Sequence, residues 1–517
     1  MAEPYYITTA IHYPNGRPHI GHAYEMIAAD AIARFQRQAG RDVLFQTGTD
    51  EHGLKMAQAA RERGVPVRDF ADEMSSHFSV MADRLGISYD RFIRTVDDDH
   101  YAASKAIWQA MADAGDLYLD RYEGWYSVRD EAFYDEAELG GEGDDRRSPQ
   151  GTPVEWTAEE TWFFRLSKYQ QPLLDHYAAN PDFIRPESRR NEVLRFVEGG
   201  LSDLSVSRTS FDWGVPVPGS PGHVMYVWVD ALTNYITGTG YPDATAEGAR
   251  HWPADLHLIG KDIVRFHAVY WPAFLMSAKI ALPKSVFGHG FLLSRGEKMS
   301  KSVGNVVDPM ALADAFGVDA LRYFFLREVS FGQDGSYSAE AIVTRVNAEL
   351  ANSFGNLAQR TLSFVAKNLE GGFPEAGDAA DADGLLIEEV VVACAGLKAA
   401  FADLMLSQGI EAWMRGVFAC NQYIDAQAPW ALRKTDPERM MAVLGTLYRA
   451  IGDLAVAILP VIPTAAGKLL DQMGISAGER SFAALADEGR YDRLASSGFK
   501  LEPPTPIFPR LEPVGES

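Results

Sequence analysis

The sequence predicts an α/β fold in which a Rossmann-like, doubly wound parallel sheet is split by a connective insertion and followed by an α-helical bundle. Three observations lead to this prediction. A strand, a loop, a helix and a second strand follow one another near the N-terminus, which is the order of a parallel βαβ unit. Aromatic and acidic residues crowd the range 117–213 and interrupt that order, which resumes near His223. After Tyr337 the strand patterns stop and long helical patterns take over.

The N-terminal βαβ unit is the clearest of these patterns. Residues 5–10 (YYITTA) are aromatic or β-branched and predict a strand, and the turn-rich stretch 12–18 follows it. An apolar stripe at helical spacing predicts a helix from about 19 to 38, and residues 43–46 predict the second strand. Ligands of such sheets bind at the carboxyl ends of the strands, so the loop after Ala10 is a predicted site.

The second half of the sheet repeats this alternation. The apolar run 224–229 and the stretches 256–259 and 285–287 are expected to be strands. A helical pattern runs from the second of these stretches through Met276. This order predicts further parallel strands in the same sheet.

The C-terminal part reads as a helix bundle. Helical patterns cover about 339–368, 385–418 and 437–459, with a polar break at 371–384. The Pro-rich tail, 503–517, is expected to be either loose or packed as an extended strap. The patterns together predict four parts: the first half of the Rossmann domain at 1–116, the insertion at 117–213, the second half of the Rossmann domain at 214–337, and the helical domain with its tail at 338–517.

Composition excludes several classes of protein. The 517 residues are 47% hydrophobic and 23% charged, which is typical of a globular protein. No apolar run reaches the roughly 18 residues of a membrane span, and no basic segment precedes an apolar one at the start, so a cytoplasmic location is expected. Only Cys394 and Cys420 occur, which excludes a disulfide framework and a zinc site built from several thiolates.

The charge of the chain raises a conflict. Its 48 basic and 71 acidic side chains leave a net charge of −23, which argues mildly against a nucleic-acid partner, because phosphate binding needs Lys and Arg. A local basic face can still bind RNA on an acidic protein. Both readings stay open at this point.

The first segment with a chemical signature is His19-Ile20-Gly21-His22, where the first loop meets a helix N-terminus. Backbone N–H groups there are unpaired and the helix dipole favours negative charge. Gly21 lets a phosphate or a flat ring approach the backbone closely. The arrangement suits a polyphosphate, although two histidines can equally be no more than helix caps.

The second such segment is Lys298-Met299-Ser300-Lys301-Ser302, between Gly296 and Gly304. Two lysines with hydroxyls and glycines beside them form a cationic loop that can clamp phosphates. A stretch of this kind on its own is usually a solvated loop. Its pairing with the first segment makes a phosphate-binding role the stronger hypothesis.

HIGH and KMSKS resemble the two signatures of the class I aminoacyl-tRNA synthetases, and further segments resemble the methionyl-tRNA synthetases among them. The match runs over nearly the whole chain. The segments are ITTAIHYPNGRPHIGHAYE at 7–25, TGTDEHG at 47–53, YVWVDALTNY at 226–235, LIGKDIVRFHAVYWPA at 258–273, GHGFLLSRGEKMSKS at 288–302 and APW at 428–430.

This resemblance implies that ATP activates methionine to methionyl-adenylate with release of pyrophosphate, and that methionine then passes to the 3′-terminal adenosine of tRNA(Met), the initiator tRNA included. The methionine carboxylate is already ionised at pH 7 and needs no general base. Catalysis is then positioning and charge stabilisation. The resemblance implies that His19 and His22 bind the phosphates, that Lys301 neutralises the leaving pyrophosphate with help from Lys298, and that Mg²⁺ bridges the phosphate oxygens.

The resemblance also assigns residues to the two small substrates. Aromatic walls suit the polarizable thioether of methionine, Tyr235 is expected to offer its hydroxyl to the sulfur, Asp50 to pair with the ammonium group, and Arg208 to support the transition state. Taken singly, each aromatic residue is more often core packing. The methionine set is Ile11, Tyr13, Asp50, Trp228, Ala231, Tyr235, Phe266, His267 and Trp271. The ATP set is His19, Gly21, His22, Gly260, Asp262, His289, Leu292 and Lys301.

In the helical domain, Asn356 and Arg360 are four residues apart and share a helix face. The family reads the CAU anticodon with such a pair and with a tryptophan that matches Trp430 here. An exposed Trp can stack on an unstacked base, and Asn or Arg can read base edges. A local site of this kind would explain how a chain with an acidic net charge can bind RNA, although Asn and Arg on a helix face are commonly just solvated.

The chain departs from the family pattern at several points. Many members carry a zinc knuckle of paired cysteines in the insertion; here Ser127, Asp130 and Glu131 occupy that region, so no structural zinc is predicted and the aromatic residues are expected to hold the insertion together. Leu232 stands where many members have proline, and His12 has no family counterpart that explains it. A C-terminal dimerisation module is missing, so a monomer is expected.

Three alternative functions fit the sequence less well. Another class I synthetase is disfavoured, because the insertion is too short for the editing domain of the branched-chain enzymes and the cysteine-ligated active-site zinc of the cysteine enzyme cannot form here. A catalytically dead tRNA-binding protein would carry a broken HIGH or KMSKS segment, and both are intact. A small-molecule nucleotidylyltransferase would lack the KMSKS loop and the helix bundle.

Overall fold

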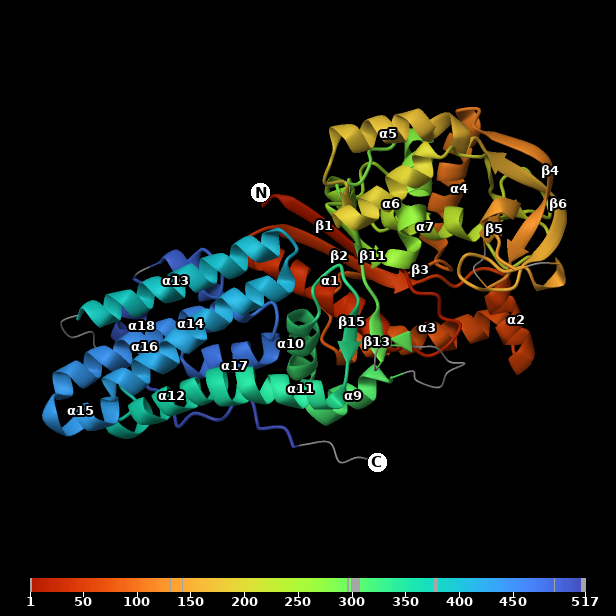
Figure 1. Ribbon diagram of the computed structural model, residues 1–517. Helices are drawn as coiled ribbons and strands as arrows, with labels where there is room; N and C mark the ends of the chain where they lie inside the picture. The colour runs from red at the N-terminus through yellow and green to blue at the C-terminus, as the bar shows by residue number, and fades with distance from the viewer. Residues whose placement is uncertain are drawn as a thin grey trace. The chain divides into compact units, whose positions relative to one another are not determined.

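The structure is a computed structural model, and it confirms the predicted fold class (Figure 1). It describes residues 2–129, 132–141, 143–294, 297–298, 307–374, 380–487 and 489–512. Two compact units share the chain. One comprises Pro4–Met26 and Leu44–His289, and the other comprises Met1–Glu3, Ile27–Val43 and Gly290–Ser517.

A six-stranded parallel sheet forms the centre of the first unit, with strand order β3-β2-β1-β11-β12-β7. Its central strands are largely buried because helices cover both faces of such a sheet, and Tyr6, Ile7, Leu258 and Ile259 are among the buried residues. The strands are β1 (Pro4–Thr9), β2 (Asp42–Thr49), β3 (Arg91–Arg94), β7 (Ile184–Arg185), β11 (Leu256–Gly260) and β12 (Val286–His289).

Helices connect these strands. The predicted first helix is α1 (Ile20–Gln38), and it begins within one residue of the expected position. The other helices between strands of this sheet are α2 (Leu54–Arg63), α3 (Val67–Arg84), α4 (Asp98–Asp113), α5 (Gln170–Ala179), α6 (Glu187–Glu198), α7 (Val227–Thr237) and α8 (Trp271–Ser277), the last preceded by a π-helical turn, Phe266–Tyr270.

The expectation of a strand at 224–229 is wrong. Only Val224–Met225 is extended, as β10, which pairs with β9 (Ser207–Arg208), and α7 begins at Val227. Nearly every residue of α7 is buried, so the helix has no solvent-exposed polar face that would mark its period. A short apolar run of this kind cannot be distinguished from a buried strand by its periodicity.

The range predicted as an insertion contains a second, antiparallel sheet of order β5-β4-β6-β8. Its strands are β4 (Leu117–Ser127), β5 (Ala132–Tyr134), β6 (Glu155–Phe164) and β8 (Leu204–Ser205). Aromatic pairs line it, among them Trp125 with Trp156 and Tyr118 with Phe163. From the same range, β7 joins the parallel sheet beside β12. The four predicted domain boundaries therefore stay predictions.

The second unit is mostly helical, as predicted. A small sheet consists of β13 (Leu292–Ser294), β14 (Glu297–Lys298) and β15 (Gly335–Tyr337). Helices α9 and α10 lie between β14 and β15 in the sequence, and α11 to α18 follow β15. Figure 1 shows α13, α14 and α16 running alongside one another. Helix α16 is long and apolar enough to cross a membrane, but 78% of its apolar window is buried in the bundle, as in the core helix of a globular domain. The long helices are α12 (Asn356–Asn368), α13 (Asp381–Ala402), α14 (Leu406–Gln427) and α16 (Pro437–Ile458).

The remaining helices of this unit are short. They are α9 (Pro309–Phe316), α10 (Val318–Glu328), α11 (Ala339–Arg345), α15 (Pro429–Thr435), α17 (Pro463–Gln472) and α18 (Arg490–Ser496), and a π-helical segment, Val346–Gly355, links α11 to α12.

Of the two expectations for the C-terminal tail, the extended strap is the one observed up to residue 512. The Asn347 side chain exchanges two hydrogen bonds with the backbone of Leu511, at 2.8 and 2.9 Å. Gln359 Nε2 donates to the Pro504 carbonyl at 3.1 Å, and the Thr505 N–H donates to Gln472 Oε1 at 2.6 Å. Side-chain amides thus satisfy backbone groups that no sheet partner pairs.

Candidate active site

The candidate residues of the first unit gather at the carboxyl ends of neighbouring parallel strands, where ligands of doubly wound sheets bind. Ile11 and Tyr13 follow β1, Asp50 follows β2, Gly260 ends β11 and His289 ends β12. The order β2-β1-β11-β12 places these four strand ends next to one another. The predicted loop after Ala10 is therefore at the centre of the site.

The histidines of the HIGH segment cap helix α1. His19 Nδ1 accepts a hydrogen bond from the Gly21 N–H at 3.1 Å, and His22 Nδ1 accepts one from the His19 N–H at 3.1 Å. The second bond is one half of a capping box, whereas in the first the N-cap side chain of His19 accepts from the N–H of the second helical residue. The two rings stack with centroids 3.8 Å apart, so the capping role and a paired imidazole surface coexist. A β-carbon on Gly21 would lie 2.9 Å from His19 Cε1, so only glycine fits beside this ring.

His12, which the sequence left unexplained, extends the pair to a row of three imidazoles. Its ring meets the His22 ring edge-on at 4.8 Å and stacks on Phe78 at 5.6 Å. Burial lowers its pKa, although Glu25 opposes that shift. Its backbone accepts from the Asp50 N–H at 2.8 Å. His12 therefore packs against the HIGH histidines and also holds the next strand end.

The aromatic residues assigned to methionine come together from α7 and the Phe266–Tyr270 turn. Trp228 and Phe266 stack with centroids 3.8 Å apart and planes at 6°. Tyr235 and His267 are almost fully buried, and Tyr235 lies 6.1 Å, centroid to centroid, from the buried Trp271. The structure thus brings these five side chains together, although they come from two separate segments.

The Tyr235 hydroxyl forms its hydrogen bond with His267. His267 Nδ1 lies 3.0 Å from the Ile263 carbonyl, which can only accept, so Nδ1 carries the proton. His267 Nε2 lies 2.6 Å from the Tyr235 hydroxyl and must accept from it. In this conformation the proton of the Tyr235 hydroxyl is directed to His267, and the expectation that this hydroxyl is offered to a sulfur atom stays a prediction.

Burial keeps both members of this pair neutral. Burial lowers the pKa of His267 to about 4. Burial also raises the pKa of Tyr235 well above its usual value, and the nearby carboxylates of Glu25 and Asp50 add to the shift. The Asp50 carboxylate thus acts on Tyr235, and the buried pair consists of a neutral phenol and a neutral imidazole.

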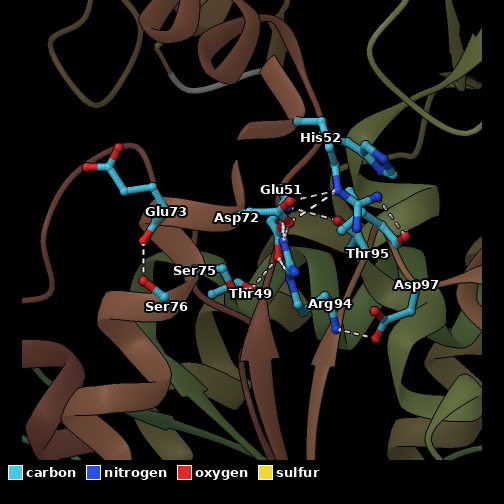
Figure 2. A network of polar contacts seen from close by, with 12 residues as sticks. Thr49, Glu51, His52, Asp72, Glu73, Ser75, Ser76, Arg94, Thr95 and Asp97 are labelled. Carbon is cyan, nitrogen blue, oxygen red and sulfur yellow. Dashed lines mark hydrogen bonds and ion pairs between the residues drawn. The ribbon is translucent and has the colours of Figure 1, made fainter. Parts of the chain in front are cut away.

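Asp50 opens a short loop, Asp50–Gly53, that is anchored on several sides (Figure 2). Glu51 is fully buried and its carboxylate binds Arg94 through two contacts, at 2.7 and 2.5 Å. The Glu51 N–H donates to Thr95 Oγ1 at 2.8 Å, and Trp213 Nε1 donates to the Glu51 carbonyl at 2.6 Å. The backbone and the side chain of Glu51, the residue after Asp50, are therefore both held in place by hydrogen bonds.

Arg208 is buried at the end of β9. Its Nη1 donates to Ser205 Oγ at 2.9 Å and to the Ser207 carbonyl at 2.6 Å. Its guanidinium carbon lies 4.5 Å from the centre of the Tyr226 ring, directly before α7. A cation is thus held next to the helix that carries Trp228 and Tyr235.

On the side assigned to adenosine, Asp262 lies beside Gly260, since a β-carbon on Gly260 would come 2.7 Å from Asp262 Oδ1. Gly260 is the N-cap residue of the short turn Lys261–Ile263, and Asp262 is the middle residue of that turn. Leu292 is buried in β13 of the other unit, paired with Gly335. Lys298 lies in β14, and Lys301 lies outside the described residues.

The sequence reasoning missed Glu25. This buried carboxylate lies on α1, three residues after His22, and accepts from His289 Nε2 at 2.7 Å. Its charge also acts on His12, Tyr235 and His267. The spacing places Glu25 on the same helix face as the HIGH histidines, which is a signal that the sequence contained.

In the helical unit, Arg360 and Trp430 come from different helices, α12 and α15, and meet. The Arg360 guanidinium lies 5.4 Å from the centre of the Trp430 ring and bonds Asp425 at 3.0 Å. Trp430 is 48% exposed, and Asn356 is exposed one helical turn before Arg360. An exposed indole beside a guanidinium is a platform on which a base can stack.

No group of three or more His, Cys, Asp and Glu side chains that could hold a metal ion occurs in the described part of the chain. In the insertion, Thr152 Oγ1 lies 2.7 Å from both Ser127 Oγ and Ser148 Oγ, and all three side chains are buried. The absence of zinc stays a prediction.

Comparison with known proteins places the whole chain in one family. Residues 5–362 match the family model "tRNA synthetases class I (M)", and residues 373–513 match the "anticodon binding domain of methionyl tRNA ligase". The methionine–tRNA ligase of Mycobacterium bovis is 58% identical over 99% of this chain and 98% of that protein, and the Brucella suis enzyme is 57% identical over 99% of each. The solved structure of the Mycobacterium tuberculosis methionyl-tRNA synthetase in complex with methionyl-adenylate is 56% identical, with a TM-score of 0.93 over 98% of this chain and 100% of that one.

Proposed function

Because this chain belongs to the methionyl-tRNA synthetases of class I and is a methionine–tRNA ligase, we propose how its own residues divide the work of the reaction. ATP is the proposed co-substrate of the first step, in which the methionine carboxylate attacks the α-phosphate and pyrophosphate leaves. The adenylate then passes its methionine to the 3′-terminal adenosine of the tRNA.

His19 and His22 bind the triphosphate in this proposal. Their stacked rings lie at the N-terminus of α1, where the backbone N–H groups and the helix dipole favour an anion. Gly21 keeps the approach to that terminus open, because its side chain is absent. Lys301, assisted by Lys298, neutralises the charge on the leaving pyrophosphate. When bound with ATP, Mg²⁺ shields the phosphate charges.

Asp50 and the aromatic pocket bind methionine. The Asp50 carboxylate pairs with the substrate ammonium, and Ile11 and Tyr13 border the same strand end. Trp228, Ala231, Tyr235, Phe266, His267 and Trp271 form the pocket for the thioether. Since His267 and Tyr235 are both neutral, the pocket favours an uncharged side chain over a charged one of similar size. Arg208 stabilises the charge of the transition state next to α7.

Gly260, Asp262, His289 and Leu292 are assigned to the adenosine. Asp262 accepts from the ribose hydroxyls, a role that is supported by its place directly after β11 at the ligand edge of the sheet. Asn356, Arg360 and Trp430 read the anticodon of tRNA(Met) and of the initiator tRNA, with Trp430 as the stacking surface. We further propose that the ligase acts in the cytoplasm. We also propose that it is a monomer, and sedimentation equilibrium tests this oligomeric state.

The observation that carries this proposal is the stacked His19–His22 pair at a helix N-terminus among four adjacent strand ends. The test is ATP–pyrophosphate exchange with methionine, compared with leucine, isoleucine and cysteine. Exchange that depends on methionine alone is expected.

Lys301→Ala is expected to lower the exchange rate by at least about a hundred-fold with little change in methionine binding, since it removes a charge that acts mainly in the transition state. Near-normal exchange in this variant contradicts the role of Lys301.

A further inference from the structure

The loop Asp50–Gly53 is tied to helix α7 by a side chain that the proposed reaction does not use. His52 Nδ1 lies 2.6 Å from Asp230 Oδ2, and Asp230 belongs to α7. The other nitrogen of the ring, Nε2, lies 2.9 Å from the Tyr101 hydroxyl. His52 thus bridges two segments that are far apart in the sequence, and both of its nitrogens are engaged.

Asp230 is a fixed partner for this bridge. It is fully buried, and its second oxygen lies 2.7 Å from His100 Nε2 on α4. Burial by itself would raise its pKa, but the two histidines lower it to about 2, so the group is a carboxylate at neutral pH. A buried carboxylate held from two sides is a stiff connection, because losing either donor leaves charge uncompensated.

The connection joins the two ends of the proposed methionine site. Asp50, two residues before His52, is the proposed partner of the ammonium group. On α7, Asp230 lies between Trp228 and Ala231 and five residues before Tyr235, which are proposed to line the thioether pocket. The loop has little freedom to move independently of His52, because Glu51, the residue between Asp50 and His52, is bound by Arg94 and Thr95 (Figure 2).

We propose that His52 is a positioning residue for substrate specificity: through Asp230 it sets the distance between the ammonium anchor and the end of the side-chain pocket. A fixed distance between the two contacts selects amino acids by side-chain length, since a longer or shorter side chain cannot satisfy both at once. This inference rests on the proposed roles of Asp50 and α7.

The experiment compares methionine with ethionine, which is one methylene longer, in ATP–pyrophosphate exchange. His52→Ala is expected to raise the KM for methionine at least about ten-fold, because a buried hydrogen bond to a charged group is lost. It is also expected to reduce the preference for methionine over ethionine several-fold. His52→Asn, whose amide nitrogen can replace Nδ1 toward Asp230, is expected to recover most of both losses, whereas His52→Gln, which reaches toward Tyr101 instead, is not.

A matched control separates positioning from stability. Asp255→Asn changes a largely buried carboxylate that binds the Tyr6 N–H at 2.9 Å at the amino ends of the same strands, opposite the site. This variant is expected to unfold at a lower temperature but to keep the wild-type preference. If His52→Ala raises both KM values by one common factor, or if His52→Asn recovers no more than His52→Gln, His52 has only a structural role and the inference is wrong.

Failure of the inference can be distinguished from failure of the proposed site. If Asp50→Asn leaves the KM for methionine unchanged, the ammonium anchor is misassigned and the inference falls with it. If Asp50→Asn raises this KM but its effect is simply additive with that of His52→Ala, the anchor stands and the coupling is wrong. A double variant that is clearly less impaired than the sum of the two supports the coupling.

Discussion

The chemistry of the proposed methionine pocket depends on one buried pair, Tyr235 and His267. The Ile263 carbonyl fixes the tautomer of His267, and this tautomer makes the imidazole an acceptor for the Tyr235 hydroxyl. Each polar atom of the pair is then satisfied without a charge. The pocket therefore offers a thioether an apolar, polarizable surface, and an ammonium or carboxylate placed there would remain unsolvated.

The pKa of His267 predicts how this pair responds to pH. Burial holds it at about 4 in the folded chain, against 6.5 for an ordinary histidine. Between these values the unfolded chain binds the proton and the folded chain does not, so the stability falls as the pH drops from about 6.5 to 4. The contribution of this group is roughly 3 kcal/mol at most. His267→Gln is expected to show a smaller fall in unfolding temperature between pH 7 and pH 4.5 than the wild type, measured by circular dichroism. An equal fall in both proteins contradicts the neutral, buried state of His267.

At the scale of a single element, the N-terminus of α1 has to satisfy two demands. Its histidines close the first turn of the helix, and the same rings form the proposed phosphate surface. Glycine at position 21 allows the His19 ring to do both, because a β-carbon at this position would come too close to that ring.

Gly21→Ala tests this separation. Alanine favours a helix by about 1 kcal/mol over glycine, so the fold is expected to be as stable or more stable. The added β-carbon would lie 2.9 Å from His19 Cε1 and displace the imidazole, so the exchange rate is expected to fall at least about ten-fold. Gly467→Ala is the matched control, since this glycine lies inside α17 with no atom within 4 Å of an added β-carbon. Loss of activity in both variants, or in neither, contradicts the role of Gly21.

The elements that the sequence predicted well are those with local signals. Helix α1 has a cap and an apolar stripe within its own residues, so its start was predicted to within one residue. Helix α7 and strand β7 were not predicted, because the first is buried on nearly all sides and the second has only two residues, which pair with the distant β12. The site residues likewise fall into those with a local sequence signal and those that only the fold brings together. The HIGH segment is contiguous, whereas the partners of Tyr235 and of Glu25 are 32 and 264 residues away and only the fold brings them together.

At the scale of the whole molecule, the first question is whether a metal holds the insertion together. Buried hydroxyls of Ser127, Ser148 and Thr152 join the ends of its hairpin at 2.7 Å, and stacked aromatic side chains line its sheet. Metal analysis of the purified protein is therefore expected to find no stoichiometric zinc, and phenanthroline is expected to leave the unfolding temperature unchanged. Chelation of Mg²⁺ by EDTA is expected to stop the exchange reaction until Mg²⁺ is restored. One zinc per chain would overturn this account of the insertion.

The second question is how a chain with a net charge of −23 uses an RNA substrate. Non-specific attraction to the phosphate backbone is weak for such a protein, so recognition has to rest on a few local contacts. Arg360 and Trp430 supply a stacking surface of this kind in the helical unit, whereas the histidines and the methionine pocket belong to the other unit. The two steps of the reaction should therefore be separable by substitution.

Trp430→Ala tests that separation. Stacking of one base on an aromatic side chain contributes about 1–3 kcal/mol, so kcat/KM for tRNA(Met) in aminoacylation is expected to fall about ten-fold or more. Methionine-dependent ATP–pyrophosphate exchange, which needs no tRNA, is expected to stay within about two-fold of the wild type, because Trp430 belongs to the helical unit and is 48% exposed. Phe418→Ala serves as the control, since this side chain on α14 of the same unit is also aromatic and 49% exposed, and it is expected to change neither reaction. Equal losses of aminoacylation and exchange in the Trp430 variant would show that the indole stabilises the fold and does not read the anticodon.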